Sequence, residues 1–168
     1  MDFAPSLPRI DLDGLRRAPI RIAWDTLSPL PGGTRLFSRL VGEIAPYTGT
    51  LGAHVVELRS GFAKVELRER RRLRNHLESV HAMALANLGE LTTGLAMMYD
   101  FPEDARGIVT AFEVRYLKKA RGRLTATCET TPVTTSEEQE KVLEGVIRNP
   151  NGEVACTVTA TWLIRPKA

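Results

Sequence analysis

The stretch from Ser79 to Met98, SVHAMALANLGELTTGLAMM, decides the fold of this 168-residue chain. It contains no proline, is rich in good helix formers and carries apolar residues around most of a helical circumference. The pattern predicts a helix over residues 80–98 with Ser79 as its N-cap. Because so few of its positions are polar, we expect this helix to be buried on nearly all sides, at the centre of the fold.

On both sides of this helix the hydrophobic period changes to two. Apolar and polar residues alternate over residues 53–68 around a Ser-Gly turn at 60–61, which predicts a hairpin. After the helix, alternation predicts strands at 108–116, 124–128, 141–148 and 153–164, and positions 108, 110, 112, 114 and 116 are expected to share one face. These elements predict an α+β fold in which a curved antiparallel sheet wraps around one long central helix.

The segment before the hairpin, residues 1–50, is expected to form an N-terminal lead and one extra packing helix. Three prolines in the first 20 residues favour an extended lead. Apolar residues then recur at helical spacing from Leu36 to Ile44, with Thr34 as the expected N-cap and Pro46 as the end. Residues 51–168 form the sheet and central helix, and a chain of this length fits a single domain overall.

Composition excludes several classes of protein. The content of 43% apolar and 26% charged residues is ordinary for a globular protein, and a net charge of +3 favours anionic ligands without indicating a nucleic-acid binder. No spacing of ligand residues predicts a metal, no motif predicts a cofactor, and no apolar run is long enough to span a membrane. We expect a cytoplasmic protein in which Cys128 and Cys156 are buried, reduced thiols.

Polar residues that could carry chemistry gather at the start of the long helix and at one point within it. The first amides of a helix are unpaired and the helix dipole is positive there, so residues 74–82 could receive a polarised carbonyl oxygen. Glu90 is a carboxylate in the middle of an apolar helix. It either reaches solvent or an arginine of a neighbouring strand, or acts as a general base or nucleophile with a raised pKa.

The distance between these two places constrains any shared mechanism. Ala82 and Glu90 are eight residues apart, which is about 12 Å along a helix. Groups that react with one carbon must approach to about 3 Å, so Glu90 would have to come from a second copy of the chain. One sheet also covers only part of so apolar a helix. Both arguments predict a homodimer, or a homotetramer made by pairing dimers.

The motif residues resemble those of the hotdog-fold thioesterases of the PaaI-like kind, over roughly residues 50–164. The resemblance is carried by Asn75, His81-Ala82-Met83, Glu90 and the stretches 107–110 and 116–122. It implies the hotdog fold and hydrolysis of acyl-coenzyme A. It further implies that Asn75 and the backbone N–H of Ala82 hold the thioester carbonyl, and that Glu90 of the other subunit acts as base or nucleophile.

Other family positions carry over less directly. His81 matches the motif histidine, for which we expect local hydrogen bonding, and a polar residue of the next strand falls on Val109 or, with a one-residue slip, on Thr110. Ala82 and Met83 replace the two glycines of the family's His-Gly-Gly, so Met83 is expected to limit the length of the acyl tail. Glu78 stands where a glycine is often found.

The basic stretch 68–74 offers phosphate ligands. Arg70 and Arg72 are expected to hold the phosphates of coenzyme A, with a solvated strand end as the alternative. No aromatic residue interleaves these arginines, which disfavours nucleic acid. The replaced glycines leave a second function open, a non-catalytic protein that binds acyl-CoA or a fatty ligand. A hydratase would need a histidine and carboxylate arrangement that we do not find.

Overall fold

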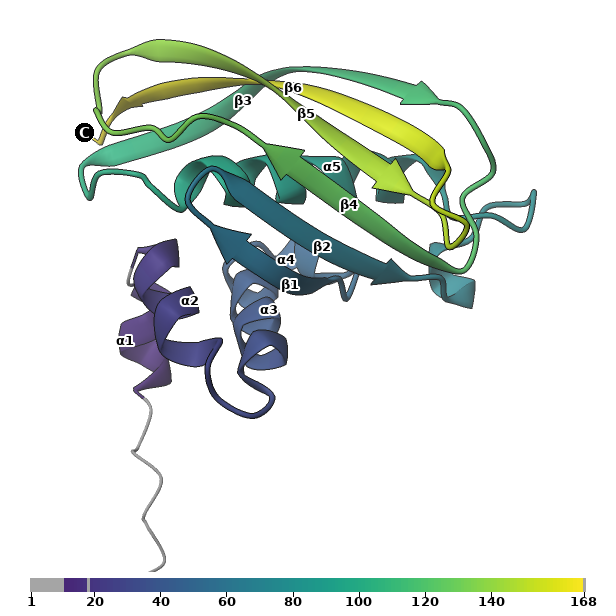
Figure 1. The fold of residues 1–168 in the computed structure, drawn as a ribbon, viewed down its shortest axis with the longest axis horizontal. Coiled ribbons are helices and arrows are strands. Elements are labelled where there is room, and N and C mark those ends of the chain that lie inside the picture. Colours follow the sequence, from purple (N-terminus) through teal and green to yellow (C-terminus); the bar gives the residue numbers. More distant parts are fainter. Residues whose placement is uncertain (1–10, 18, 168) are drawn as a thin grey trace, which may run out of the picture.

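The computed structural model describes residues 11–17 and 19–167, in which a curved sheet lies over one long helix (Figure 1). The helices are α1 (Leu12–Arg17), α2 (Ile20–Leu27), α3 (Gly33–Ile44), α4 (Pro46–Gly49) and α5 (Ala82–Met98), with a short 3-10 turn at Arg71–Leu73. The strands are β1 (His54–Arg59), β2 (Phe62–Arg68), β3 (Ala105–Tyr116), β4 (Arg123–Glu129), β5 (Gln139–Arg148) and β6 (Val154–Pro166).

The strands form one sheet in the order β1-β2-β4-β5-β6-β3, and every neighbouring pair is antiparallel. The inner face of the sheet curves around α5, while α1 to α4 lie beside β1 and β2 (Figure 1). This arrangement is the hotdog fold, and it confirms the predicted α+β architecture with a central helix.

Helix α5 lies closest to the sheet at a pair of glycines. A Cβ atom on Gly89 would stand 2.4 Å from Cβ of Val158 on β6, and Gly145 of β5 lies against the backbone of Gly89. Elsewhere along α5 the side chains of Leu88, Ala96 and Met97 are completely buried. The helix is thus held against the sheet by close backbone approach as well as by apolar side chains.

The start of α5 differs from the prediction. The helix begins at Ala82, and its N-cap is His81, whose Nδ1 accepts a hydrogen bond from the Met83 amide at 3.1 Å. Ser79, predicted as the cap, instead directs its hydroxyl to Asn75 Oδ1 at 3.3 Å. The prediction was wrong because His81 has a side-chain acceptor that can cap a helix as Ser79 would have done.

Strand β3 contains a β-bulge that changes which residues share a face. Val109 pairs with Trp162 and Ala111 with Thr161, so Thr110 is the extra residue between them. Phe112 pairs with Ala160. The bulge places Ile108 and Thr110 on the opposite face of the strand from Phe112. The prediction that the alternate positions 108, 110, 112, 114 and 116 share one face was therefore wrong.

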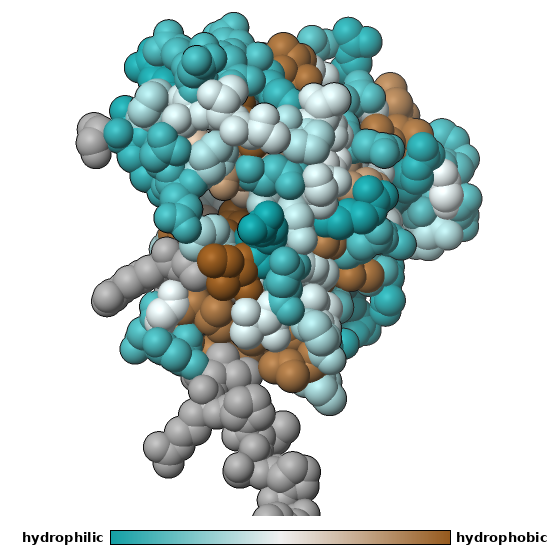
Figure 2. Space-filling model, turned by 60° about the vertical axis from the view of Figure 1, so that its left-hand side comes forward, coloured by the Kyte–Doolittle hydropathy of each residue, from teal (hydrophilic) through white to brown (hydrophobic). Residues whose placement is uncertain are grey.

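The N-terminal part is more helical than predicted. Residues 12–17 form helix α1 where an extended lead was expected, and residues 20–27 form helix α2, for which no helix was predicted. Pro5 and Pro8 lie outside the described residues. Trp24 of α2 packs edge-on against Phe37 of α3, with ring centroids 5.0 Å apart. Figure 2 shows this end of the molecule, with brown apolar surface over the N-terminal helices in a mostly teal face.

Helix α3 covers the β1 edge of the sheet. The Val55 amide of β1 donates to Oγ of Ser38 at 2.9 Å, and Thr34 Oγ1 lies 3.0 Å from Nε2 of His54. Thr34 was predicted to be the N-cap of α3, and this prediction was wrong. The N-cap is Gly32, whose φ is +75°. The Ser38 hydroxyl serves both the edge strand and its own helix, because it also donates to the Thr34 carbonyl at 2.7 Å.

Strand β3 is the opposite edge, and no other described strand pairs with its outer side. Apolar side chains stand on it in the open: Ile108 is 49% exposed, Phe112 47% and Tyr116 49%. An edge this long and apolar is a surface that another chain could extend.

Candidate functional site

The loop before α5 is folded around the side chain of Asn75. Its Oδ1 accepts hydrogen bonds from the amide of Leu77 at 2.9 Å, and from the amide and hydroxyl of Ser79 at 3.3 Å each. The Asn75 amide in turn donates to the Ser79 carbonyl at 2.9 Å. Because Oδ1 accepts hydrogen bonds within the loop, Nδ2 is the donor that the carboxamide has left. No hydrogen bond among the described residues uses Nδ2.

The amide of Ala82 is the first N–H of α5. The His81 amide donates to Leu73 and the Met83 amide to the His81 side chain. No hydrogen bond within the described chain uses the N–H of Ala82. The helix start therefore offers one unsatisfied amide at the positive end of the dipole.

Asn75 and Ala82 border the same hollow, a cavity of about 310 Å³ at the start of α5. Its other lining residues come from the end of the loop, from α5 and from the segment after β3: Ser79, Val80, Leu85, Tyr116, Leu117, Lys118, Lys119 and Ala120. The hydroxyl of Tyr116 donates to the Ala82 carbonyl at 3.1 Å and joins the end of β3 to the helix start. Two predicted carbonyl donors are thus brought together beside Lys118 and Lys119, two of the basic residues that the sequence offered as possible phosphate ligands.

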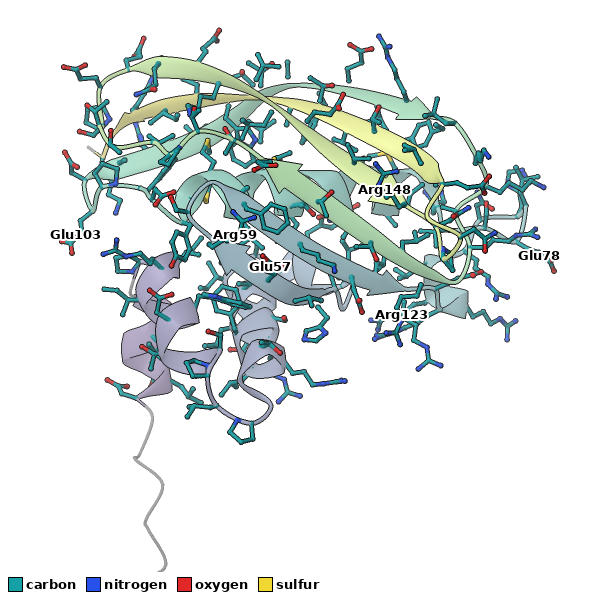
Figure 3. All side chains as sticks on the ribbon, in the orientation of Figure 1. Glu57, Arg59, Glu78, Glu103, Arg123 and Arg148 are labelled. Carbon is teal, nitrogen blue, oxygen red and sulfur yellow. The ribbon has the colours of Figure 1, made fainter. Side chains whose placement is uncertain are left out.

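Glu78 occupies the turn immediately before this hollow. Its φ is +54°, in the left-handed region that favours glycine, which is the residue often found there in the resembled family. Arg121 donates to the carbonyls of Glu78 and Leu77 at 2.9 and 3.2 Å and holds the turn. The Glu78 side chain points away from the body of the molecule (Figure 3), so its charge does not enter the hollow.

Glu90 lies two turns further along α5 and does not line the hollow. Its carboxylate is half-buried, and this burial raises its pKa above the ordinary range of a glutamate. Within the described residues it forms no ion pair with an arginine or lysine, so the expected alternative of an arginine partner is not found. A half-buried carboxylate without a countercharge is a candidate for proton transfer.

The remaining predicted residues are dispersed. Met83 is 58% exposed and does not border the hollow. Thr110, at the bulge, bonds its hydroxyl to the Thr161 carbonyl at 3.3 Å. Arg70 lines a different groove beside α3, and a guanidinium nitrogen of Arg72 lies next to it over Gly52. His81 makes the local hydrogen bond that was expected of it.

Other chemistries find little support in the described residues. Cys128 and Cys156 are buried and unpaired, and burial raises the pKa of their thiols to about 12 and about 11, so both stay protonated at neutral pH. Across residues 11–17 and 19–167, no group of three His, Cys, Asp or Glu side chains could hold a metal ion. None of the helices there has the length and apolarity needed to cross a bilayer.

Comparison with protein families gives one match. The model of the family described as "Domain of unknown function (DUF4442)" matches residues 33–164, which include α3, the whole sheet as far as Ile164, and α5. No curated protein matches the chain in sequence.

Solved structures share the fold over most of the chain. A structural-genomics crystal structure is 27% identical with a TM-score of 0.75, covering 88% of this chain and 99% of the other. A Pseudomonas aeruginosa protein of unknown function, described as a "probable thioesterase", is 22% identical with a TM-score of 0.71, covering 82% and 97%. A Haemophilus influenzae thioesterase is 16% identical with a TM-score of 0.62, covering 71% and 82%.

Proposed function

Because the chain belongs to the DUF4442 family and has the hotdog fold, we propose that it hydrolyses acyl-coenzyme A thioesters. The observation that carries this proposal is the hollow at the start of α5, where Nδ2 of Asn75 and the N–H of Ala82 stand ready as donors. Hotdog structures named as thioesterases, from Haemophilus influenzae among others, support the reaction class.

The hollow supplies what a thioester carbonyl needs. As water adds to the carbonyl carbon, negative charge develops on the oxygen, and two preorganised N–H donors with a helix dipole behind one of them stabilise that charge. The loop bonds to Oδ1 fix the carboxamide of Asn75 before substrate arrives, so little reorganisation is needed. His81 and Met83 flank this place and belong to the proposed substrate contacts.

The attacking group comes from a second subunit in this proposal. Glu90 is about 12 Å along the axis from Ala82 in its own helix, too far to serve the same carbonyl. In a dimer formed across the β3 edges, Glu90 of the partner subunit would enter the hollow, and Thr110 on β3 would lie close to it. The catalytic unit is then the dimer, with a tetramer of two dimers as the larger form.

Two routes use Glu90 with balanced chemistry. As a base it takes a proton from water, the water oxygen bonds to the carbonyl carbon, the C–S bond breaks, and the thiolate of coenzyme A takes up a proton. As a nucleophile its oxygen bonds to the carbonyl carbon and displaces the thiolate, and water then cleaves the resulting anhydride. Burial favours both routes, because it raises the pKa of the Glu90 carboxyl and reduces the hydration of the carboxylate.

Substrate contacts beyond the carbonyl are assigned to the basic loop and to Met83. Arg70 and Arg72 lie in the loop after β2, and we propose that they contact phosphates of coenzyme A. Lys119, at the hollow itself, adds positive charge for the same ligand, whereas Lys118 there is ion-paired with Glu153. Met83, in place of a glycine, favours small or medium acyl groups over long ones.

The alternative is a protein that binds acyl-CoA or a fatty ligand without cleaving it. It is favoured by the side chains of Ala82 and Met83, which narrow a place where glycines would allow close approach of the ligand. This alternative predicts saturable binding of an acyl-CoA analogue with no release of thiol.

A panel of acyl-CoA esters of increasing chain length, assayed by release of free thiol, tests the proposal. We expect turnover of at least one ester, and a loss of ~10² to 10⁴-fold in kcat for Glu90→Gln with the folded mass unchanged. Glu144→Gln, which removes an exposed glutamate of β5, is the matched control and should retain full activity. Absence of turnover for every ester by the wild type would reject hydrolysis and leave the binding alternative.

A further inference from the structure

A second and larger groove lies on the other side of the sheet from α5. It has a volume of about 1140 Å³ and runs between α3, α4 and the outer face of β1 and β2, reaching Arg123 at the start of β4. It shares no lining residue with the hollow at the start of α5. Its volume is slightly above the range of about 300 to 1000 Å³ that is typical of small-molecule sites, so the groove has room for a small organic ligand.

The lining of this groove, which we call the arginine groove, is strongly basic. It contains five arginines, Arg35, Arg39, Arg68, Arg70 and Arg123, against two glutamates, Glu43 and Glu66. In Figure 3, Arg123 points to the side of the sheet on which α3 and α4 lie. The positive charge comes from three separate elements and the loop after β2, and all of it converges on one concavity.

Two of these arginines lie opposite each other on neighbouring strands, an arrangement that destabilises the sheet. Arg68 and Arg123 occupy directly opposite positions of the β2 and β4 ladder. Like charges at such positions destabilise a sheet. Arg123 has one compensating contact, with Glu66 at 3.4 Å, whereas Arg68 has no ion pair with any described residue. Neither have Arg35, Arg39 and Arg70, so most of the positive charge is uncompensated within the described chain.

A sixth arginine, Arg72, lies at the rim of the arginine groove, next to Gly52. Gly52 has φ of +60°, and a Cβ atom there would stand 2.7 Å from Nη1 of Arg70 and 3.2 Å from Nη2 of Arg72. The missing side chain lets two guanidinium groups gather over one stretch of backbone. His54, on the groove wall, responds to the same field, since its pKa is lowered by burial and then by Arg35.

We propose that the arginine groove is a ligand site for an organic phosphate that carries at least two phosphoryl groups. Arginine forks match phosphate oxygens two at a time, and several of them around one concavity favour a diphosphate over a single phosphate. No phenylalanine, tyrosine or tryptophan lines the groove and His54 is its one aromatic ring, so the lining lacks the row of stacking rings that single-stranded nucleic acid uses. Leu36, Ala53 and Val56 give it an apolar part for the organic portion.

Calorimetric titration of the full chain with ADP, inorganic diphosphate and adenosine tests the site. The wild type is expected to bind ADP and diphosphate, more weakly as salt is raised, and not to bind adenosine. Arg68→Gln with Arg123→Gln should weaken ADP binding by about tenfold or more, because charge-assisted hydrogen bonds are lost. Arg35→Gln with Arg39→Gln, on the opposite wall, should have the same effect.

The control is Arg59→Gln with Arg165→Gln, which removes two exposed, ion-paired arginines outside the groove and should leave ADP binding intact. Equal affinity of the wild type and both groove variants would overturn the proposal. So would binding of adenosine as tight as that of ADP, no ADP binding at millimolar concentration in low salt, or an oligoribonucleotide that binds tightly while ADP does not compete. Relief of the opposed charges predicts that Arg68→Gln unfolds at no lower temperature than the wild type.

Two sources can supply such a diphosphate, and one of them depends on the proposed function. It is either the phosphorylated adenosine diphosphate end of coenzyme A or a free nucleotide. If it is coenzyme A, the Arg68→Gln and Arg123→Gln variant raises KM for acyl-CoA with kcat unchanged. If it is a free nucleotide, KM stays the same while ADP binding is lost. Failure of hydrolysis would leave the ADP titration, and therefore the site, unaffected.

Discussion

The two edges of the sheet are treated in opposite ways. At β1, helix α3 lies along the edge and Ser38 accepts the outward-facing amide of Val55, so the strand is closed to further pairing. At β3, the outer side of a twelve-residue strand has no partner among the described residues, and Phe112 and Tyr116 stand half exposed beside it.

This difference bears on the proposed dimer. Proteins usually cover, charge or shorten an exposed edge strand to prevent unwanted pairing. Here the β1 edge has that protection and the β3 edge does not, although β3 is the longer of the two. The contrast supports the proposal that two subunits meet across β3, next to the hollow that needs the partner's Glu90.

The largest expected effect comes from a charge on the open edge. Phe112→Asp should convert the dimer to a monomer and lower thioester turnover by more than ~100-fold, because each site would lose the partner's carboxylate. Light scattering and thiol release measure the two consequences. Val142→Asp is the matched control, because Val142 is 66% exposed but belongs to β5, which lies between β4 and β6 and away from the β3 edge.

If Phe112→Asp stays a dimer with full activity, the open edge is not the interface. A monomeric wild type at micromolar concentration would remove the shared site altogether. In either case the contrast between the edges would need another explanation.

The pH dependence of stability tests the burial of Glu90, the carboxylate that the proposed dimer would share across the β3 edge. Burial raises the pKa of this carboxyl in the folded state, so the folded chain holds the proton more tightly than the unfolded chain. The free energy of unfolding therefore loses this contribution as pH rises from the ordinary glutamate range through the raised pKa. Glu90→Gln should gain stability relative to the wild type over that window in urea titrations. A difference that shrinks with rising pH would contradict the burial argument.

A smaller effect is expected at the closed edge. Ser38→Ala removes the acceptor of the Val55 amide and should lower the free energy of unfolding by about 1 kcal/mol, with no change in mass. Ser28→Ala, in a loop residue for which no side-chain hydrogen bond is found in the described chain, serves as the comparison. Equal stability of the two variants would show that α3 shields the β1 edge by packing alone.

The smallest effect is expected where the open edge meets the helix start. Tyr116→Phe removes only the bond from the hydroxyl to the Ala82 carbonyl, and because this bond is half exposed we expect a loss of about 0.5 kcal/mol. Denaturant titration measures it. A much larger loss would mean that the end of β3 holds the hollow together.

Much of the fold could be predicted because its pattern is local. The apolar circumference of α5 and the alternating strands are properties of single segments, and they were sufficient for the architecture. The bulge at Thr110 was not predictable in this way, since one extra residue leaves both halves of the strand looking regular and shifts only their relative phase. Helix α3 was predicted, whereas α1 and α2 were missed because both are short and the burial of α2 depends on contacts such as Trp24 with Phe37.

The candidate site came from the family resemblance and not from spacing. Asn75 and Ala82 line one hollow, and their role in binding a thioester carbonyl stays a prediction. The identity of the N-cap depended on how the loop closes on Leu73, and the position of Arg70 depended on the path of α3 and α4, which lie far from it in the sequence. Contacts of that kind cannot be read from spacing.

The glycine contact between α5 and the sheet limits how relatives of this chain can vary in length. Gly89 lies between Ala82 and Glu90 in the sequence and is fixed by Val158 and Gly145. One residue inserted between Ala82 and Gly89 would turn the helix start by about 100° and move it by about 1.5 Å, taking the free amide out of the hollow. Insertions are therefore compatible with the site in the turn between α5 and β3 and at the N-terminal helices. The seven-residue spacing between Ala82 and Gly89 therefore fixes the position of the free amide relative to the sheet.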